Sequence, residues 1–153
     1  MNAPGSWRDL SSSALFGLID GLNGMVGLVI GLLRVHAVAA VIFVALLARA
    51  GSSSVSMAGA QYESADPGES RRQRWSRVAA MGLGYLASAL TPGLGFAVST
   101  RAGLIVFIPV TAAILAGITW FRSSTAGWLR AALTTAVIFI LAVGAGLAAS
   151  LAG

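Results

Sequence analysis

The sequence contains no cysteine and no lysine, and it has a single histidine, His36. Without cysteine, disulfides and thiolate metal sites are excluded. Without lysine, the 19 glycines cannot form the phosphate-binding loop that ends in that residue. One histidine and no paired buried carboxylates leave no constellation for hydrolytic or redox chemistry. These absences predict a protein that is not an enzyme and holds no permanent cofactor.

Charge is scarce as well, since 10% of the residues are charged against about 25% in a typical soluble domain. At the same time 57% of the 153 residues are hydrophobic, and a chain of this length buries only about two-thirds of its surface on folding. An aqueous core cannot hide so much apolar side chain, whereas a lipid bilayer removes the need to hide it. The sequence therefore predicts a single integral, multi-pass membrane domain with the bilayer as a partner.

Five apolar runs are each long enough to cross a bilayer, which takes about 20 residues. They cover residues 14–33, 37–60, 78–98, 102–121 and 128–151. We therefore expect an all-α membrane protein in which residues 14–151 form five transmembrane helices, with a cytoplasmic N-terminal segment (1–13) and a cytoplasmic linker (62–77). Short turns predict that the first two helices form one antiparallel hairpin and the next two another. Pro92 and Pro109 each remove a backbone donor and predict kinks.

The arginines are divided unevenly between the two sides of this predicted bundle. One side carries Arg8, Arg71, Arg72, Arg74, Arg77, Arg122 and Arg130. The other carries Arg34 and Arg101. Because cytoplasmic loops are rich in basic residues, the N-terminus is expected in the cytoplasm and the C-terminus on the opposite side. Basic residues placed between apolar runs are topology signals, so no nucleic-acid partner is expected. The alanine-rich, arginine-only composition favours a bacterial plasma membrane.

Glycines recur along the first helix at spacings of three or four. They are Gly17, Gly21, Gly24, Gly27 and Gly31. This spacing puts them in one stripe on a helix, and glycine allows another helix to approach closely in lipid. The stripe indicates either packing inside the bundle or the seam of a homodimer.

Two ionisable residues, Asp20 and Arg49, interrupt the apolar runs. Each costs at least about 2.5 to 3.5 kcal/mol at the centre of a bilayer. Asn23 shares a face with Asp20, and polar residues share a sector of the second helix, which predicts a hydrophilic seam between the two helices. That sector contains Arg49, Ser53, Ser56, Ala60 and Glu63. From the expected helix ends, Asp20 lies about 9 Å deep, Met57 about 5 Å and Arg49 about 16 Å.

These depths leave two interpretations of Asp20. With the thioether of Met57 and the oxygens of Asn23, Gln61 and Glu63, its carboxylate offers a mixed hard and soft site that suits Fe²⁺ or Mn²⁺. Alternatively, Asp20 and Arg49 form a structural ion pair, and Met57 is a core or lipid-facing side chain.

Three short segments resemble the vacuolar iron transporter family. They are Phe16-Gly17-x-x-Asp20-Gly21, the run SMAGAQYES at residues 56–64, and Tyr85-x-x-Ser88-Ala89-x-x-Pro92. The resemblance implies five helices and a homodimer, with the first helices lining a metal path near the two-fold axis. It implies Asp20 and Met57 as metal-contacting positions. Independently of the resemblance, we expect structural or gating roles for Gly21, Gly24 and Arg49. Members of the family move Fe²⁺, and often Mn²⁺, out of the cytoplasm, commonly in exchange for protons.

The sequence departs from the family in three places. Gln61 stands where the family has a glutamate, which keeps an oxygen ligand and loses a charge. Arg49 replaces a small or neutral residue, and a cation facing the path would repel Fe²⁺. The cytoplasmic metal-binding domain between the second and third helices is missing. We therefore expect a divalent-metal transporter, with a diverged, non-transporting membrane scaffold or assembly protein as the alternative.

Overall fold

The computed structural model describes residues 7–151, without the side chains of residues 7–8, 125–126 and 149–150. The regular structure of these described residues is entirely helical. The elements are α1 (Trp7–Arg34), α2 (Ala39–Glu63), α3 (Arg71–Leu90), the 3₁₀ helix η1 (Pro92–Ala97), α4 (Thr100–Ala126) and α5 (Trp128–Leu151). Helix α1 begins seven residues before the expected start at residue 14. Residues 1–6 of the expected N-terminal segment, and the side chain of Arg8, lie outside the described residues.

Four of these helices are long and apolar enough to cross a membrane. They span Asp9–Arg34, Ala39–Glu63, Thr100–Ser124 and Trp128–Ala148. This pattern fits an integral, multi-pass membrane protein, since only helices and closed barrels satisfy every backbone polar group inside lipid.

The third expected helix, residues 78–98, differs from the structure at both ends. It begins earlier, at Arg71, because Ser70 and Gln73 form a capping box in which each side chain binds the other residue's backbone N–H. It ends at Leu90, and the chain continues from Pro92 as η1. Pro92 has no N–H to donate to the preceding turn, which favours the end of the α-helix at this point. Pro109, in contrast, lies inside the continuous helix α4.

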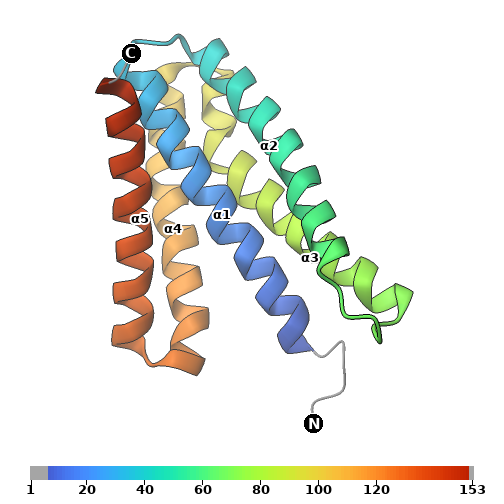
Figure 1. Cartoon of the computed structure of the whole chain (residues 1–153). Helices are drawn as coiled ribbons and strands as arrows, with labels where there is room; N and C mark the ends of the chain where they lie inside the picture. Colours follow the sequence, from blue (N-terminus) through green and yellow to red (C-terminus); the bar gives the residue numbers. More distant parts are fainter. Residues whose placement is uncertain (1–6, 152–153) are drawn as a thin grey trace.

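Helix α1 runs through the middle of the bundle (Figure 1). It packs mainly on α3 and α5, whereas α2 covers α3, and α4 lies against η1 and α5. The start of α1 and the end of α5 lie at opposite ends of the bundle, and the α4–α5 hairpin diverges from α1 toward the end where α1 begins (Figure 1). As predicted, a short turn joins α1 and α2, which run in opposite directions (Figure 1). However, α1 contacts α2 far less than it contacts α3.

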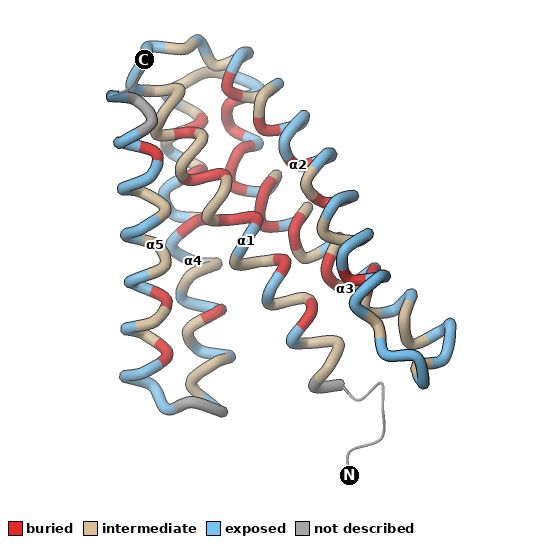
Figure 2. The backbone as a smooth tube through the Cα atoms, viewed as in Figure 1, coloured by how far each residue is buried: buried red, intermediate tan, exposed pale blue. Residues whose placement is uncertain are grey.

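The apolar core lies where α1 crosses its neighbours, and Figure 2 shows the buried segments concentrated there. Its largest fully buried side chains include Tyr85, Phe96, Leu22, Met25, Ile42 and Leu46. Outward-facing side chains are also apolar, for example Val55 at 73% exposure and Trp120 at 78%. An apolar outer surface over a packed core is the arrangement expected of helices surrounded by lipid.

The glycine stripe packs the bundle internally. A methyl group on Gly21 would lie 2.7 Å from the carbonyl oxygen of Tyr85 on α3, so only glycine allows this approach. Gly17 lies against the backbone of α3 in the same way, and Gly27 lies against Gly146 of α5. Of the two interpretations of the stripe, these contacts support the intramolecular one.

Candidate functional site

Asp20 lies on a side of α1 that no other helix covers. Ser12, Phe16 and Asp20 are all exposed and follow one another at a spacing of four, so they form a narrow strip that we name the open face of α1. Helix α1 has 28 residues and is roughly 42 Å long. Asp20 is therefore about 20 Å from its first residue, deeper than the 9 Å expected from a start at residue 14. The carboxylate is near the middle of the helix.

Arg49 reaches from α2 onto α1, one turn beyond Asp20. A methyl group on Gly24 would lie 2.6 Å from Nη2 and 3.0 Å from Nε of Arg49, so the guanidinium rests on the surface that Gly24 leaves open. Arg49 lies about 21 Å from the end of α2. Asp20 and Arg49 are thus at similar heights, although these two described residues form no ion pair with each other.

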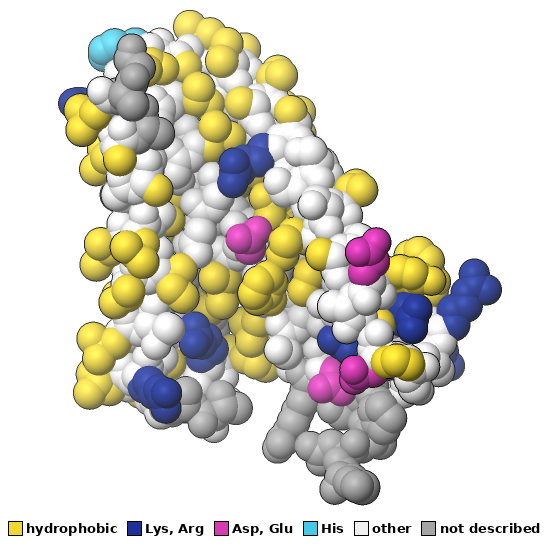
Figure 3. Space-filling view, viewed as in Figure 1, with side chains coloured by type: hydrophobic (Ala, Val, Ile, Leu, Met, Phe, Trp, Pro, Cys, Tyr) yellow, Lys and Arg dark blue, Asp and Glu magenta, His cyan; other side chains and the backbone are white. Residues whose placement is uncertain are grey.

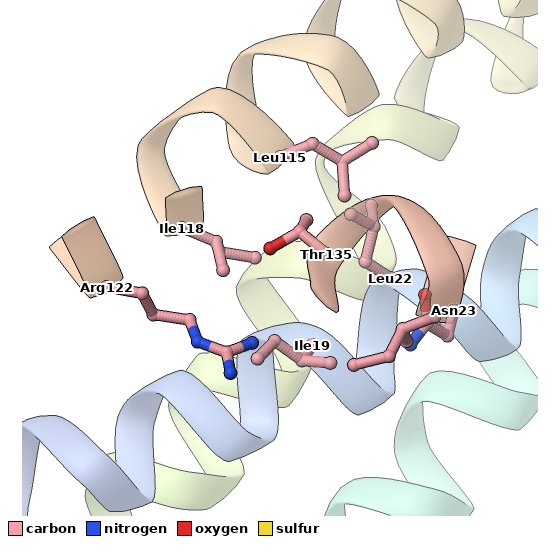
Figure 4. Close-up of a pocket in the computed structure, with 8 residues that line it drawn as sticks. Ile19, Leu22, Asn23, Leu115, Ile118, Arg122 and Thr135 are labelled. Atoms are coloured by element: carbon pink, nitrogen blue, oxygen red, sulfur yellow. The ribbon is translucent and has the colours of Figure 1, made fainter. Parts of the chain in front are cut away.

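Met57 and Asn23 lie in different surroundings from Asp20. Met57 is partly buried and packs against the apolar core. Asn23 lines a cavity of about 10 Å³ between α1, α4 and α5. Figure 4 shows Asn23 beside Leu22 on α1, with Arg122 extending from α4 toward Ile19. A space of this size holds one water molecule at most.

Gln61 lines a polar cavity of about 520 Å³ at the end of the bundle where α1 begins. The polar residues around this cavity are Asp9, Ser12, Ser13, Gln61, Asp66 and Arg77. Gln61 itself is only 7% exposed. Glu63, two residues later, is exposed and does not belong to the lining.

The residues expected to bind metal do not converge on one centre within a single chain. Each of them lies in a different environment. Asp20 is on the open face of α1, Asn23 lines the small cavity, and Met57 packs at the edge of the core. Gln61 lines the polar cavity, and Glu63 is on the surface. Among the described residues, no group of three or more His, Cys, Asp or Glu side chains could hold a metal ion. A transported ion bound by Asp20 would need further ligands from water or from a second copy.

Sequence reasoning did not place Asp9 and Asp66 with Gln61 in the lining of this cavity. Asp9 was assigned to an N-terminal segment outside the bundle, whereas the structure puts it in the first turn of α1. Asp66 was assigned to the cytoplasmic linker, residues 62–77. The available signal was weak: nothing in Ser11–Ser13 terminates a helix, so the polar start of the chain was compatible with an earlier beginning of α1.

The first turns of α3 contact both the last turn of α2 and the segment that links the two helices. Nη1 of Arg77 lies 2.7 Å from Oε1 of Glu69. The guanidinium of Arg74 lies 5.1 Å from the ring centre of Tyr62, and the Tyr62 and Trp75 rings are 5.3 Å apart. Figure 3 shows charged side chains gathered at this end of the molecule, with few farther along the helices.

No protein-family model matches the chain, and no curated protein matches it. The resemblance noted above therefore depends on its three short segments. Two of them meet in the structure, because Gly21 lies against the Tyr85 backbone and the Ser88 hydroxyl at the centre of the α1–α3 interface. The third forms the last two turns of α2, near the polar cavity.

Proposed function

We propose that the protein is a homodimeric transporter that moves Fe²⁺ or Mn²⁺ out of the cytoplasm, with Asp20 as its main charged ligand. The observation that carries the proposal is the exposed carboxylate on the open face, near the middle of a helix long and apolar enough to cross a membrane. A carboxylate facing acyl chains there would cost at least about 2.5 to 3.5 kcal/mol. A second α1 laid against the open face would remove it from lipid.

A two-fold axis along the open face would bring two Asp20 carboxylates together, with water completing the shell of the ion. Oxygen ligands suit Mn²⁺, and Fe²⁺ accepts them as well. A carboxylate can also exchange a metal ion for a proton, because the two compete for the same oxygens. Met57, about 9 Å from the end of α2, is the proposed soft ligand between the cytoplasmic end and Asp20.

The proposed orientation places the start of α1 in the cytoplasm. Arg71, Arg72 and Arg130 are exposed at that end of the bundle, and cytoplasmic ends are rich in arginine. In this orientation α3 and η1 together make a fifth crossing, broken at Pro92, and the C-terminus lies outside. The membrane is proposed to be a bacterial plasma membrane.

The test is Mn²⁺ flux into proteoliposomes that contain the full chain. Asp20→Asn keeps the size of the side chain and removes its charge, so flux should fall to the level of empty vesicles. Asp20→Glu keeps the carboxylate and should retain part of the flux, which separates loss of the ligand from misfolding. Equal flux in wild type and Asp20→Asn would overturn the proposed role of Asp20. No wild-type flux of Mn²⁺ or Fe²⁺ would overturn transport itself.

A non-transporting membrane scaffold is the second candidate, and the position of Arg49 favours it. The guanidinium rests one turn from Asp20, where it places a fixed positive charge beside the proposed path. In a scaffold, the two charges would neutralise each other within the assembled membrane protein, and no ion would pass.

A further inference from the structure

Two opposite charges lie on neighbouring exposed surfaces near the middle of the bundle. Asp20 is about 20 Å along α1, and the guanidinium of Arg49 rests over Gly24, one turn farther along the same helix. Both side chains are exposed, and neither forms an ion pair within the described part of the chain. The open face of α1 and the adjoining exposed side of α2 therefore carry opposite charges at nearly the same height.

Lipid cannot satisfy either of these charges. A charged side chain at the centre of a bilayer costs at least about 2.5 to 3.5 kcal/mol, so Asp20 and Arg49 each need a partner there. Only one helical turn, about 6 Å along α1, separates Asp20 from the glycine that Arg49 covers, yet the guanidinium lies on Gly24 and not on the carboxylate. A second copy with the same orientation in the membrane has both missing partners at the right height.

Charge balance favours one way for two copies to meet. A two-fold seam between the open faces brings two Asp20 carboxylates together, and without a metal ion they repel each other strongly in a medium of low dielectric constant. The two Arg49 side chains make the same seam neutral, because each carboxylate gains a guanidinium and each guanidinium gains a carboxylate. Arginine suits this contact, since its planar guanidinium binds a carboxylate through two parallel hydrogen bonds.

We infer that the open faces of two copies bind each other through two reciprocal ion pairs, in which Asp20 of each copy binds Arg49 of the other. The inference rests on the homodimer of the proposed function and adds the state of the seam when no metal is bound. In that state the partner's Arg49 takes the place of the ion. A divalent cation that binds both carboxylates must displace both guanidiniums, so Arg49 controls access to Asp20.

The test is the assortment of two charge-reversed chains that carry different affinity tags and are co-expressed at full length. Asp20→Arg leaves two cations at the seam of its chain, and Arg49→Asp leaves two anions. Each variant alone should form few dimers, because both of its pairs become repulsive. Together, their mixed dimers should exceed like dimers by roughly tenfold, since opposite charges then face each other at both pairs. Sequential purification on the two tags after mild extraction measures the ratio.

The same mixture separates pairing between copies from pairing inside a chain. If Asp20 paired with Arg49 of its own chain, each variant would keep two like charges together in every dimer, and mixing would rescue neither. A chain with both changes restores opposite charges and should form homodimers, which controls for misfolding. Asp20→Arg mixed with Arg101→Asp is the matched control. Arg101 is exposed in the first turn of α4, outside α1 and α2, so this mixture should show no preference for mixed dimers.

Neutral substitutions give a second measurement that disturbs folding less. Asp20→Asn and Arg49→Gln should each weaken dimerisation in vesicles several-fold, because each leaves one charge unpaired in the seam. The double variant should be no weaker than either single variant, because it leaves no unpaired charge. Energy transfer between donor- and acceptor-labelled copies at decreasing protein density measures the change.

Random assortment of the charge-reversed chains, a monomeric wild type, or unchanged dimerisation of the neutral variants would overturn the reciprocal pairs. The two proposals fail separately. Wild-type protein that assorts in this pattern but moves no Mn²⁺ across a vesicle refutes transport and leaves the seam standing. Protein that transports Mn²⁺ while the charge-reversed chains assort at random refutes the reciprocal pairs alone.

Discussion

Helix α1 has a packed side and an open side, and the two differ in almost every respect. On the packed side, Gly17 and Gly21 touch the backbone of α3, and Leu22 and Met25 are at most 1% exposed. On the open side, Phe16 is 58% exposed and the Asp20 carboxylate has no covering element. Two adjacent residues, Asp20 and Gly21, therefore belong to opposite environments.

The difference between the two sides shows that glycine and charged residues mark different surfaces of α1. Glycine marks the surface where α1 meets its own chain, because only there do backbones come into contact. The charged residue marks the surface that the rest of the described chain leaves exposed. A dimer seam should therefore be sought along Ser12, Phe16 and Asp20, and not along the glycines.

The largest expected effect concerns the packed side. Gly21→Ala adds one methyl group 2.7 Å from the Tyr85 carbonyl oxygen and against Ser88, and backbone atoms of α3 cannot move aside. We expect a loss of about 1–3 kcal/mol of stability, as for other overpacked cores. Thermal unfolding of the detergent-solubilised protein, followed by circular dichroism, measures it.

The matched control is the same substitution at Gly59, where an added methyl group meets nothing within 4 Å. Gly59→Ala should leave the unfolding temperature unchanged or raise it slightly, since alanine favours helix by up to about 1 kcal/mol. Similar losses at both positions would show that α1 does not meet α3 through Gly21.

The next effect concerns the open side. The chain has no cysteine, so a single Phe16→Cys change gives a unique thiol on the open face. Two copies in one membrane have the same orientation, and an α1–α1 seam would place the two thiols near each other. Mild oxidation in membranes should then give a covalent dimer on a non-reducing gel, provided that the Cα atoms come within about 7 Å.

Ile105 on α4 is exposed to a similar extent, at 64%, and lies away from the open face. Ile105→Cys should remain monomeric under the same oxidation. Cross-linking of both variants would indicate random collision, and cross-linking of Ile105→Cys alone would move the seam to α4.

Apolar runs and polar breaks predicted much of this fold. They located α1, α2, α4 and α5, because a span of about 20 apolar residues has few alternatives to a membrane helix. The bounds of α3 were not predictable in the same way. Its first turns, Arg71–Arg77, are strongly polar, and its start depends on the capping interaction of Ser70 and Gln73. Pro92 was visible in the sequence, but whether a proline kinks or ends a helix depends on its neighbours.

The candidate site was less predictable, because its geometry depends on which helices touch. Asp20 stood out as a charge in an apolar run, and the structure leaves it exposed. Its expected proximity to Met57 assumed that α1 pairs with α2, whereas α1 packs mainly on α3. The polar cavity is lined by Asp9, Gln61 and Asp66 from three parts of the chain, and no periodicity in the sequence brings such residues together.

The smallest expected effect concerns Arg49, whose guanidinium covers Gly24 at the border between the packed and open sides of α1. If metal passes along the open face, removing this cation should reduce repulsion, and Arg49→Ala should raise Mn²⁺ flux in proteoliposomes by roughly two- to fivefold. Arg101→Ala removes another exposed arginine, in the first turn of α4, and should leave flux unchanged. In a scaffold, Arg49→Ala would instead lower the yield or unfolding temperature without any flux, because Asp20 would lose its counter-charge. Unchanged flux with unchanged stability would exclude both roles for Arg49 and would leave the guanidinium on Gly24 as a packing contact.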